Sequence, residues 1–239
     1  LHHGDATSLR DKAIVAELVA DVAVRGTRTR SYSQIEDAKD RLTANISVDS
    51  GPGEISVRIE TVRDSLPEVI ALVADLLRNP TFAAAELAAV KQEAISDVEE
   101  SLQDPTQLAF VRLGQLVAPW PAGDPRAHLG LTEQIAALEK VTAKDLRAYH
   151  AAFWGAGHGE VSAVGDFDVD ALSKALEVAF AGWTSKAPYA RLADKAFGPP
   201  AKEEVIDTRD KEMAIVLAAL SLLGLGIFVP GIASGIVSG

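Results

Sequence analysis

The stretch Ser8–Thr27, SLRDKAIVAELVADVAVRGT, reads as one amphipathic helix around which the rest of the chain can be organised. Ser8 and Asp11 have the spacing of a capping box, which predicts the start of the helix. Gly26 can adopt the left-handed conformation that ends a helix. Apolar residues three and four positions apart predict a broad buried face, formed by Ile14, Val15, Leu18, Val19, Val22 and Val24.

The same helix carries two carboxylates, Glu17 and Asp21, which lie four residues apart and therefore on one face. They can form a solvated surface, or they can share a cation with a third carboxylate, Asp97, further along the chain. Oxygen ligands of this kind suit calcium or magnesium better than zinc. The sequence leaves both interpretations open.

The composition excludes several classes of function. The 239 residues include 34 Asp and Glu against 23 Lys and Arg, which gives a formal net charge of -11. A nucleic-acid surface needs clustered basic residues, so we expect no nucleic-acid partner. The chain contains no cysteine, which excludes disulfides, thiolate catalysis and Cys-ligated zinc.

An alternating apolar pattern follows the first helix and predicts a β-hairpin. Residues 42–48 and 55–61 alternate between apolar and polar side chains around the turn Ser50-Gly51-Pro52-Gly53. A capping box at Ser33 and Glu36 predicts a short helix between the first helix and the hairpin.

Helical periods dominate the middle of the chain, with predicted helices from Asp64 or Ser65 to Asn79, over 84–102, over 106–117, from Thr132, from Thr142 to Phe153 and over 169–180. Residues 160–165 predict a strand, and residues 205–207 a further one. Helices and strands in this order predict an α+β fold, with helices packed on one face of a mainly antiparallel sheet.

None of the common catalytic motifs is complete. A nucleophile elbow, a P-loop and a dinucleotide-binding glycine pattern are all missing from the sequence. His128, His150 and His158 are scattered, and we interpret them as structural or exposed. His2 and His3 are adjacent, so an extended backbone would point them to opposite faces, which makes a shared metal awkward.

Several short segments, taken in order, resemble the pitrilysin/insulinase family of zinc peptidases. They are Val24-Arg25-Gly26-Thr27, Ser33-Gln34-Ile35, the hairpin, Asp64-Ser65-Leu66-Pro67, Leu76–Phe82, Val141–His150 and Val164–Asp168, so that the match runs over about Leu1 to Leu220. The resemblance implies the pitrilysin-like metallopeptidase fold.

Catalytic members of that family carry an H-x-x-E-H motif on the first helix, with two zinc-binding His and a Glu base. Counting back from Gly26-Thr27, the motif falls on Glu17-Leu18-Val19-Ala20-Asp21, with the downstream ligand near Asp97. Carboxylates replace both His, and alanine cannot take a proton from water. We therefore assign no catalytic, cofactor-binding or metal-binding residue to this chain.

The resemblance implies a degenerate, non-catalytic half that pairs with a zinc-bearing half, on the same or a separate chain, and encloses peptide substrates. It also favours a periplasmic location. The Arg/Tyr pair with which such halves contact peptide has no convincing match here. Alternatives from other classes are a carboxylate-based divalent-cation module and a membrane-anchored assembly subunit.

The C-terminal end departs from the family pattern. Residues 213–239 carry no charge, and from 224 onward, GLGIFVPGIASGIVSG, the sequence no longer resembles the family. The stretch 213–239 fits a buried strand with an irregular or truncated tail, a membrane segment or an expression artefact. Residues 213–220 fit a buried strand. We predict a domain over 1–184, a linker over 185–204 and a following strand region over 205–239.

Overall fold

The computed structural model describes residues 1–198, 202–206 and 215–219. The helices are α1 (Ala13–Ala23), α2 (Tyr32–Arg41), the 3-10 turn η1 (Arg63–Ser65), α3 (Leu66–Arg78), α4 (Ala84–Gln103), α5 (Pro105–Val117), α6 (Leu131–Lys140), α7 (Ala143–Phe153) and α8 (Val169–Phe180). The strands are β1 (Asn45–Gly51), β2 (Glu54–Glu60), β3 (Lys202–Ile206) and β4 (Ile215–Ala219). This α+β arrangement confirms the predicted fold class.

The strands form two separate antiparallel pairs in the described part of the chain, so the sheet is smaller than predicted. β1 and β2 pair from Asn45 with Glu60 to Gly51 with Glu54, which confirms the predicted hairpin and its turn. β3 pairs with β4 beside α5. The predicted strand residues 205 and 206 lie in β3, and β4 lies within the apolar stretch at 213–220.

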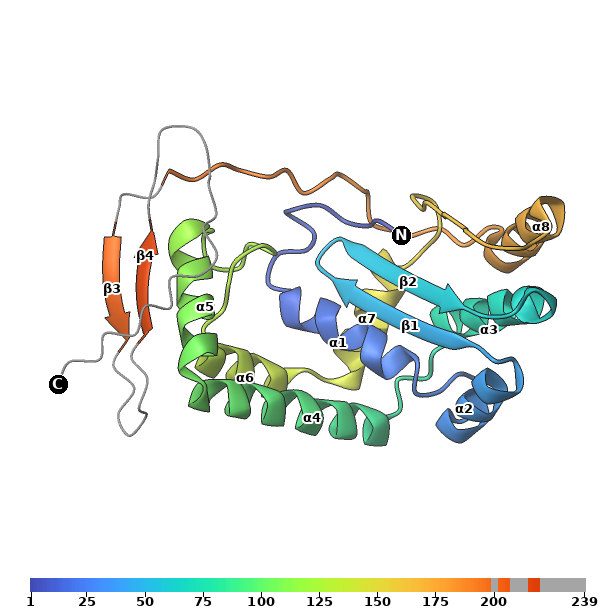
Figure 1. Ribbon diagram of the computed structural model, residues 1–239, viewed down its shortest axis with the longest axis horizontal. Coiled ribbons are helices and arrows are strands. Elements are labelled where there is room, and N and C mark those ends of the chain that lie inside the picture. Colours follow the sequence, from blue (N-terminus) through green and yellow to red (C-terminus); the bar gives the residue numbers. More distant parts are fainter. Residues whose placement is uncertain (199–201, 207–214, 220–239) are drawn as a thin grey trace.

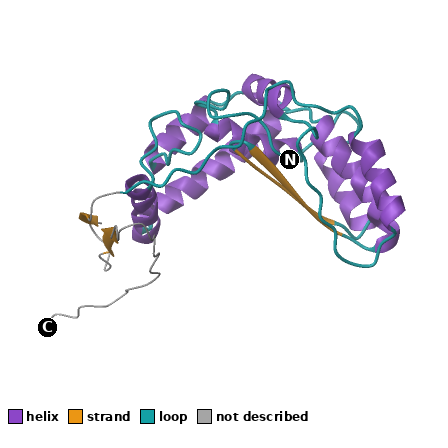
Figure 2. Ribbon diagram, turned by 90° about the horizontal axis from the view of Figure 1, so that it is seen from above, coloured by secondary structure: helices purple, strands orange, loops and turns teal. Residues whose placement is uncertain are grey.

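The core is built around α1, which packs against β1, α7 and α4 (Figure 1). Of the predicted apolar face, Leu18, Val19 and Val22 are buried, while Ile14, Val15 and Val24 are only partly buried against the core. Leu76, Leu146 and Trp154 join them from α3, α7 and the residue after α7. Figure 2 shows the helices following an arch, with the β1–β2 hairpin along its inner side.

Two predicted helix starts are wrong. Ser8 does not cap α1, because its hydroxyl accepts a hydrogen bond from the Asp5 amide at 2.9 Å and the helix begins only at Ala13. Asp11 instead has a left-handed backbone, with φ of 58°. The capping box of α2 is formed by Ser31 and Gln34, two residues before the predicted position.

Three other helix starts stay close to prediction. Thr142 and Asp145 form the predicted capping box of α7. Asp168 caps α8 through the amide of Ala171 at 2.8 Å. α6 begins at Leu131, one residue before the predicted Thr132.

The strand predicted over 160–165 is absent. Its side chains are exposed, including Val161 at 67% and Val164 at 101% of their full surface. Alternation makes a strand only where a neighbouring strand supplies hydrogen bonds, and residues 160–165 make none with the described backbone. The edge of β2 beside this segment is occupied instead by residues 1–3, since the Ile55 amide donates to the Leu1 carbonyl at 2.8 Å.

No helix within residues 1–198 is long and apolar enough to cross a membrane, and neither is any other described part. Of the stretch 213–239, for which a membrane segment was one interpretation, only β4 lies within the described residues. Residues 185–198 form neither helix nor strand, and β3 begins at Lys202. The domain boundaries at 184 and 204 remain predictions.

Candidate functional site

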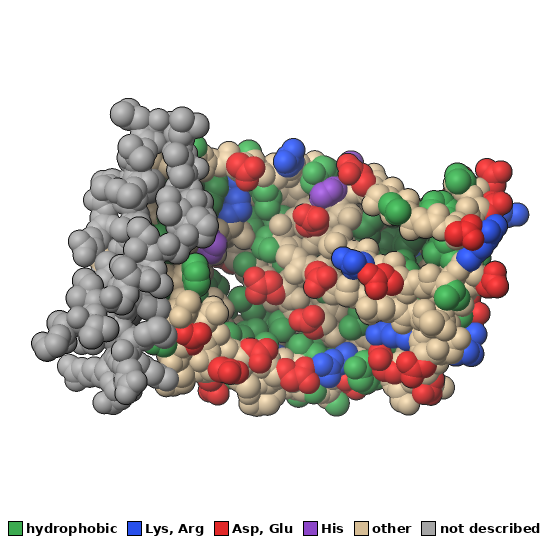
Figure 3. All heavy atoms as spheres, in the orientation of Figure 1, with side chains coloured by type: hydrophobic (Ala, Val, Ile, Leu, Met, Phe, Trp, Pro, Cys, Tyr) green, Lys and Arg blue, Asp and Glu red, His purple; other side chains and the backbone are tan. Residues whose placement is uncertain are grey.

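The five residues of α1 at the position of the metal motif, 17–21, are partly buried in the core and partly exposed. Leu18, Val19 and Ala20 are buried with at most 2% of their surface exposed. Glu17 and Asp21 are exposed, as expected for residues four apart on the opposite side. Acidic side chains gather over the middle of this face of the molecule (Figure 3).

Charged residues from three elements surround the α1 carboxylates. Although Glu17 and Asp21 keep exposed surface, the neighbouring protein removes part of the water around their carboxyl groups. This desolvation raises the pKa of Glu17, and the charge of Asp21 adds to the effect. Desolvation also raises the pKa of Asp21, as do Asp49 on β1 and Glu93 on α4, while Arg25 opposes the shift. Arg25 is itself engaged, because its guanidinium pairs with Glu93 at 2.5 Å.

The structure does not assemble the proposed cation site. Within the described ranges, no group of three or more His, Asp or Glu side chains is placed to hold a metal ion. Glu17 and Asp21 lie on α1, but Asp97 does not complete a ligand set with them. A hard cation needs six or more oxygen ligands. The cation-module hypothesis is therefore wrong for this cluster.

The position that the family resemblance assigns to the general base is occupied by Ala20. Its methyl group is fully buried against the core, so water does not reach it. The flanking positions hold carboxylates in place of imidazoles, and imidazole is the ligand that such zinc sites use. These residues do not fit a catalytic zinc ion, and no hydrolytic step can be derived from them.

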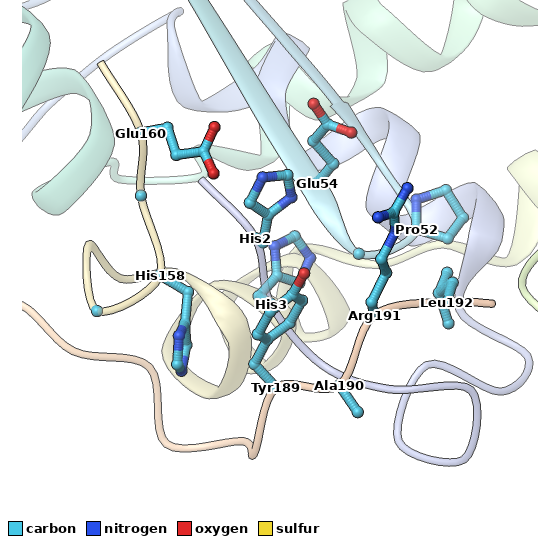
Figure 4. A pocket seen from close by; sticks show the side chains of 13 residues that line it. His2, His3, Pro52, Glu54, His158, Glu160, Tyr189, Ala190, Arg191 and Leu192 are labelled. Carbon is cyan, nitrogen blue, oxygen red and sulfur yellow. The ribbon is translucent and has the colours of Figure 1, made fainter.

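A recess with a cavity volume of 590 Å³ lies at the turn between β1 and β2, where Pro52, Gly53 and Glu54 line it (Figure 4). His2 lines it and stacks on Tyr189, with ring centroids 5.8 Å apart. The His158 ring also contacts Tyr189, with ring centroids 4.8 Å apart. Glu54, Glu160 and Arg191 supply charges of both signs.

His3 lines the same recess as His2 but is buried at the edge of the core. It is 1% exposed, and its Nε2 atom lies 2.8 Å from the Tyr149 hydroxyl. Burial lowers the pKa of His3 to about 4, so the ring is neutral at pH 7. Its contacts with Tyr149 and Phe153 make it a packing residue.

The scattered histidines have separate environments. His150 is held by the Leu77 carbonyl at 2.7 Å from its Nε2 atom, so it is structural as predicted. His128 lies beside Gly114. His158 lies in the turn after α7, at the recess of His2.

Sequence reasoning missed Tyr189 and also a second recess lined by Arg28, Arg78 and Arg147. These residues come from segments far apart in the chain, so no local spacing marks them. The three arginines share one signal in the sequence, basic charge in an acidic protein, and that signal does not say which arginines lie together.

Two family models match the chain. The model described as Insulinase (Peptidase family M16) matches residues 6–116, and the model described as Peptidase M16 inactive domain matches residues 140–227. A protein of Helicobacter pylori called a non-peptidase homolog, YmxG, is 25% identical over 218 residues, which are 89% of this chain and 48% of that protein. An uncharacterized zinc protease of Rickettsia bellii is 21% identical over 71% of this chain and 40% of its own length.

Solved structures agree with the fold. A peptidase M16 inactive domain from Pseudomonas fluorescens has a TM-score of 0.61 and 20% identity, over 84% of this chain and 47% of that one. A protease from Helicobacter pylori has a TM-score of 0.62 and 14% identity, over 81% of this chain and 46% of that one. The periplasmic protease PqqL from Escherichia coli has a TM-score of 0.58 and 15% identity, over 83% of this chain and 22% of that one. The chain spans about half the length of the first relatives it matches.

Proposed function

Because this chain belongs to the insulinase family, M16, as an inactive M16-like domain, we propose that it pairs with a zinc-bearing catalytic half and helps to enclose peptide substrates. The catalytic half is on the same polypeptide or on a separate one. In this proposal the zinc and the general base belong to that partner, and this chain contributes a surface that contacts the peptide.

The single observation that carries the proposal is Ala20. A general base must take a proton from the attacking water, and a methyl group cannot. Ala20 is also packed into the core, so that a larger side chain there would collide with its neighbours. A chain that keeps the family fold while losing this group can contribute to proteolysis through binding.

The inner side of the arch supports the enclosing role. The helices follow an arch (Figure 2), and acidic side chains gather over the middle of the face seen in Figure 3. An acidic concave surface attracts basic or unstructured cationic peptides over distances of about a Debye length, roughly 8–10 Å at physiological salt. We therefore propose that the enclosed substrates include peptides rich in Lys and Arg.

The test combines metal analysis with a peptidase assay on the purified chain. We expect no stoichiometric zinc and no chelator-sensitive cleavage of an unstructured peptide. A catalytic M16 protein from the same organism, one with an intact H-x-x-E-H motif, should form a complex with the chain in size-exclusion chromatography. Zinc-dependent cleavage by the chain alone, abolished in Asp21→Ala, would overturn the proposal.

We also propose a periplasmic site of action, on the analogy of the Escherichia coli protease among the similar structures, which is described as periplasmic. Fractionation of cells that express the chain with its natural flanking sequence tests this directly. Recovery with cytoplasmic markers would contradict it.

A further inference from the structure

The recess formed by Arg28, Arg78 and Arg147 has a cavity volume of 460 Å³. Arg28 follows α1, Arg78 ends α3 and Arg147 lies on α7, so three separate segments each contribute one arginine to the lining. The remaining wall is formed by Pro80, Thr81, Phe82, His150 and Ala151. A cluster of positive charge is unexpected in a chain with a net charge of -11.

No carboxylate of the described residues forms an ion pair with any of the three arginines. Arg78 donates from Nη1 to the Ala179 carbonyl at 2.6 Å, and Arg147 donates from Nη2 to the Phe82 carbonyl at 2.9 Å. Both acceptors are neutral backbone groups. Within the described residues none of the three takes part in an ion pair, and the guanidinium of Arg28 has no hydrogen-bond partner there.

Apart from the three arginines, the residues that line the recess are uncharged or, in the case of His150, held by a hydrogen bond. Phe82 is 1% exposed, and its ring meets His150 edge to face, with centroids 5.5 Å apart. Burial lowers the pKa of His150, the hydrogen bond to Leu77 opposes this, and the charge of Arg28 acts with burial. His150 is therefore neutral at pH 7, and the positive charge of the recess comes from the arginines.

We propose that this recess binds an oxyanion group, a phosphate or a carboxylate, carried by a small molecule. Each guanidinium presents five N–H donors in a planar fork that matches such oxygens, and most of these donors are unused here. Gathering like charges is unfavourable unless an anion offsets them, and charge-assisted hydrogen bonds are the strongest that a protein offers. The recess has room for a molecule larger than the anionic group itself.

The test is calorimetric titration of the 239-residue chain with two probes, pyrophosphate and citrate, which distinguish a phosphate source from a carboxylate source. The first variant is Arg28→Gln, because that side chain has no structural partner in the described chain. The second variant adds Arg147→Gln. The matched control is Arg58→Gln, which removes an equal charge from an exposed position on β2 that pairs with Glu60.

We expect saturable binding of at least one probe, weakened about tenfold or more by Arg28→Gln and abolished in the double variant. The control should bind as the unchanged chain does, and thermal unfolding should show that Arg28→Gln remains folded. Failure of both probes to bind at about 10 mM would overturn the proposal. So would equal binding by the unchanged chain and the double variant. Neither result depends on whether the chain pairs with a catalytic half.

Discussion

At the scale of single residues, Asp75 holds together the segment that follows α1. Its carboxylate accepts hydrogen bonds from Thr27 at 2.9 Å, Arg30 at 2.6 Å and Asn79 at 3.0 Å. Burial acts to raise the pKa of Asp75, but these bonds outweigh it and leave the pKa below its usual value. A lowered pKa means that the ionised form stabilises the fold.

We predict that Asp75→Asn lowers the free energy of unfolding by about 1–3 kcal/mol at pH 7, because charge-assisted bonds are lost. The contribution is present above the unfolded-state pKa of about 3.9 and is lost as pH falls through the lower folded value. Urea unfolding at pH 7 and pH 3 measures this. The exposed Asp37→Asn is the control, and an unchanged difference at pH 3 would contradict the linkage.

The pKa shifts of Glu17 and Asp21 are opposite in sign to that of Asp75. Their raised pKa values mean that the folded state binds protons more tightly than the unfolded chain, so stability falls as pH rises through about 4. We predict that Glu17→Gln with Asp21→Asn raises the thermal midpoint at pH 7 and leaves it unchanged at pH 3. The matched control is Asp97→Asn with Glu99→Gln on α4. A lower midpoint at pH 7 would show that these carboxylates hold a stabilising cation.

At the scale of elements, a threonine near the start of a helix stabilises the helix only where its side chain caps a free backbone amide. Thr142 caps α7, accepting from the Asp145 amide at 3.3 Å while its own amide donates to the Asp145 carboxylate at 2.9 Å. Thr132 lies inside the first turn of α6, and its side chain makes no hydrogen bond with the described residues.

We predict that Thr142→Ala lowers the free energy of unfolding by about 0.5–2 kcal/mol, the cost of a lost helix cap. Thr132→Ala should change it by about 0.5 kcal/mol or less, because an exposed residue without partners is replaced. Chemical denaturation of both variants gives the comparison. Equal losses would mean that the two helices begin elsewhere.

The segment 160–165 is predicted as a strand from the sequence but is exposed and unpaired with the described backbone in the structure. Because Val161 and Val164 are exposed, we predict that changing both to Ser alters the free energy of unfolding by about 0.5 kcal/mol or less. Val69→Ser, at a fully buried position of α3, should cost about 2 kcal/mol or more. A large loss in the first variant would show that the segment is a buried strand after all.

These elements show what could be predicted from the sequence. The hairpin and α7 were predictable because their signals are local: alternation around a Gly/Pro turn, and a Thr142-to-Asp145 box. Ser8 failed as a cap because Asp5, outside the helical pattern, takes its hydroxyl. The strand at 160–165 failed because pairing depends on a distant partner, and residues 1–3 occupy the available edge of β2.

At the scale of the whole molecule, the family resemblance and the position of the lost motif were predictable, and the recesses were not. Glu17, Ala20 and Asp21 lie on one helix, so their places follow from its period. Arg28, Arg78 and Arg147 line one recess because segments far apart in the sequence pack together there, with His150 of α7 bonded to the Leu77 carbonyl of α3. Packing of this kind is a property of the complete fold, and local spacing carries no record of it.

The arch of helices (Figure 2) and the acidic side chains gathered over the face seen in Figure 3 suit a domain that closes around a substrate together with a second half. The measurement that tests this most directly is the rate of peptide cleavage by a zinc-bearing M16 protein of the same organism, titrated with this chain. We expect a rate that rises and saturates at one chain per catalytic half. A rate that stays flat over the whole titration would contradict it.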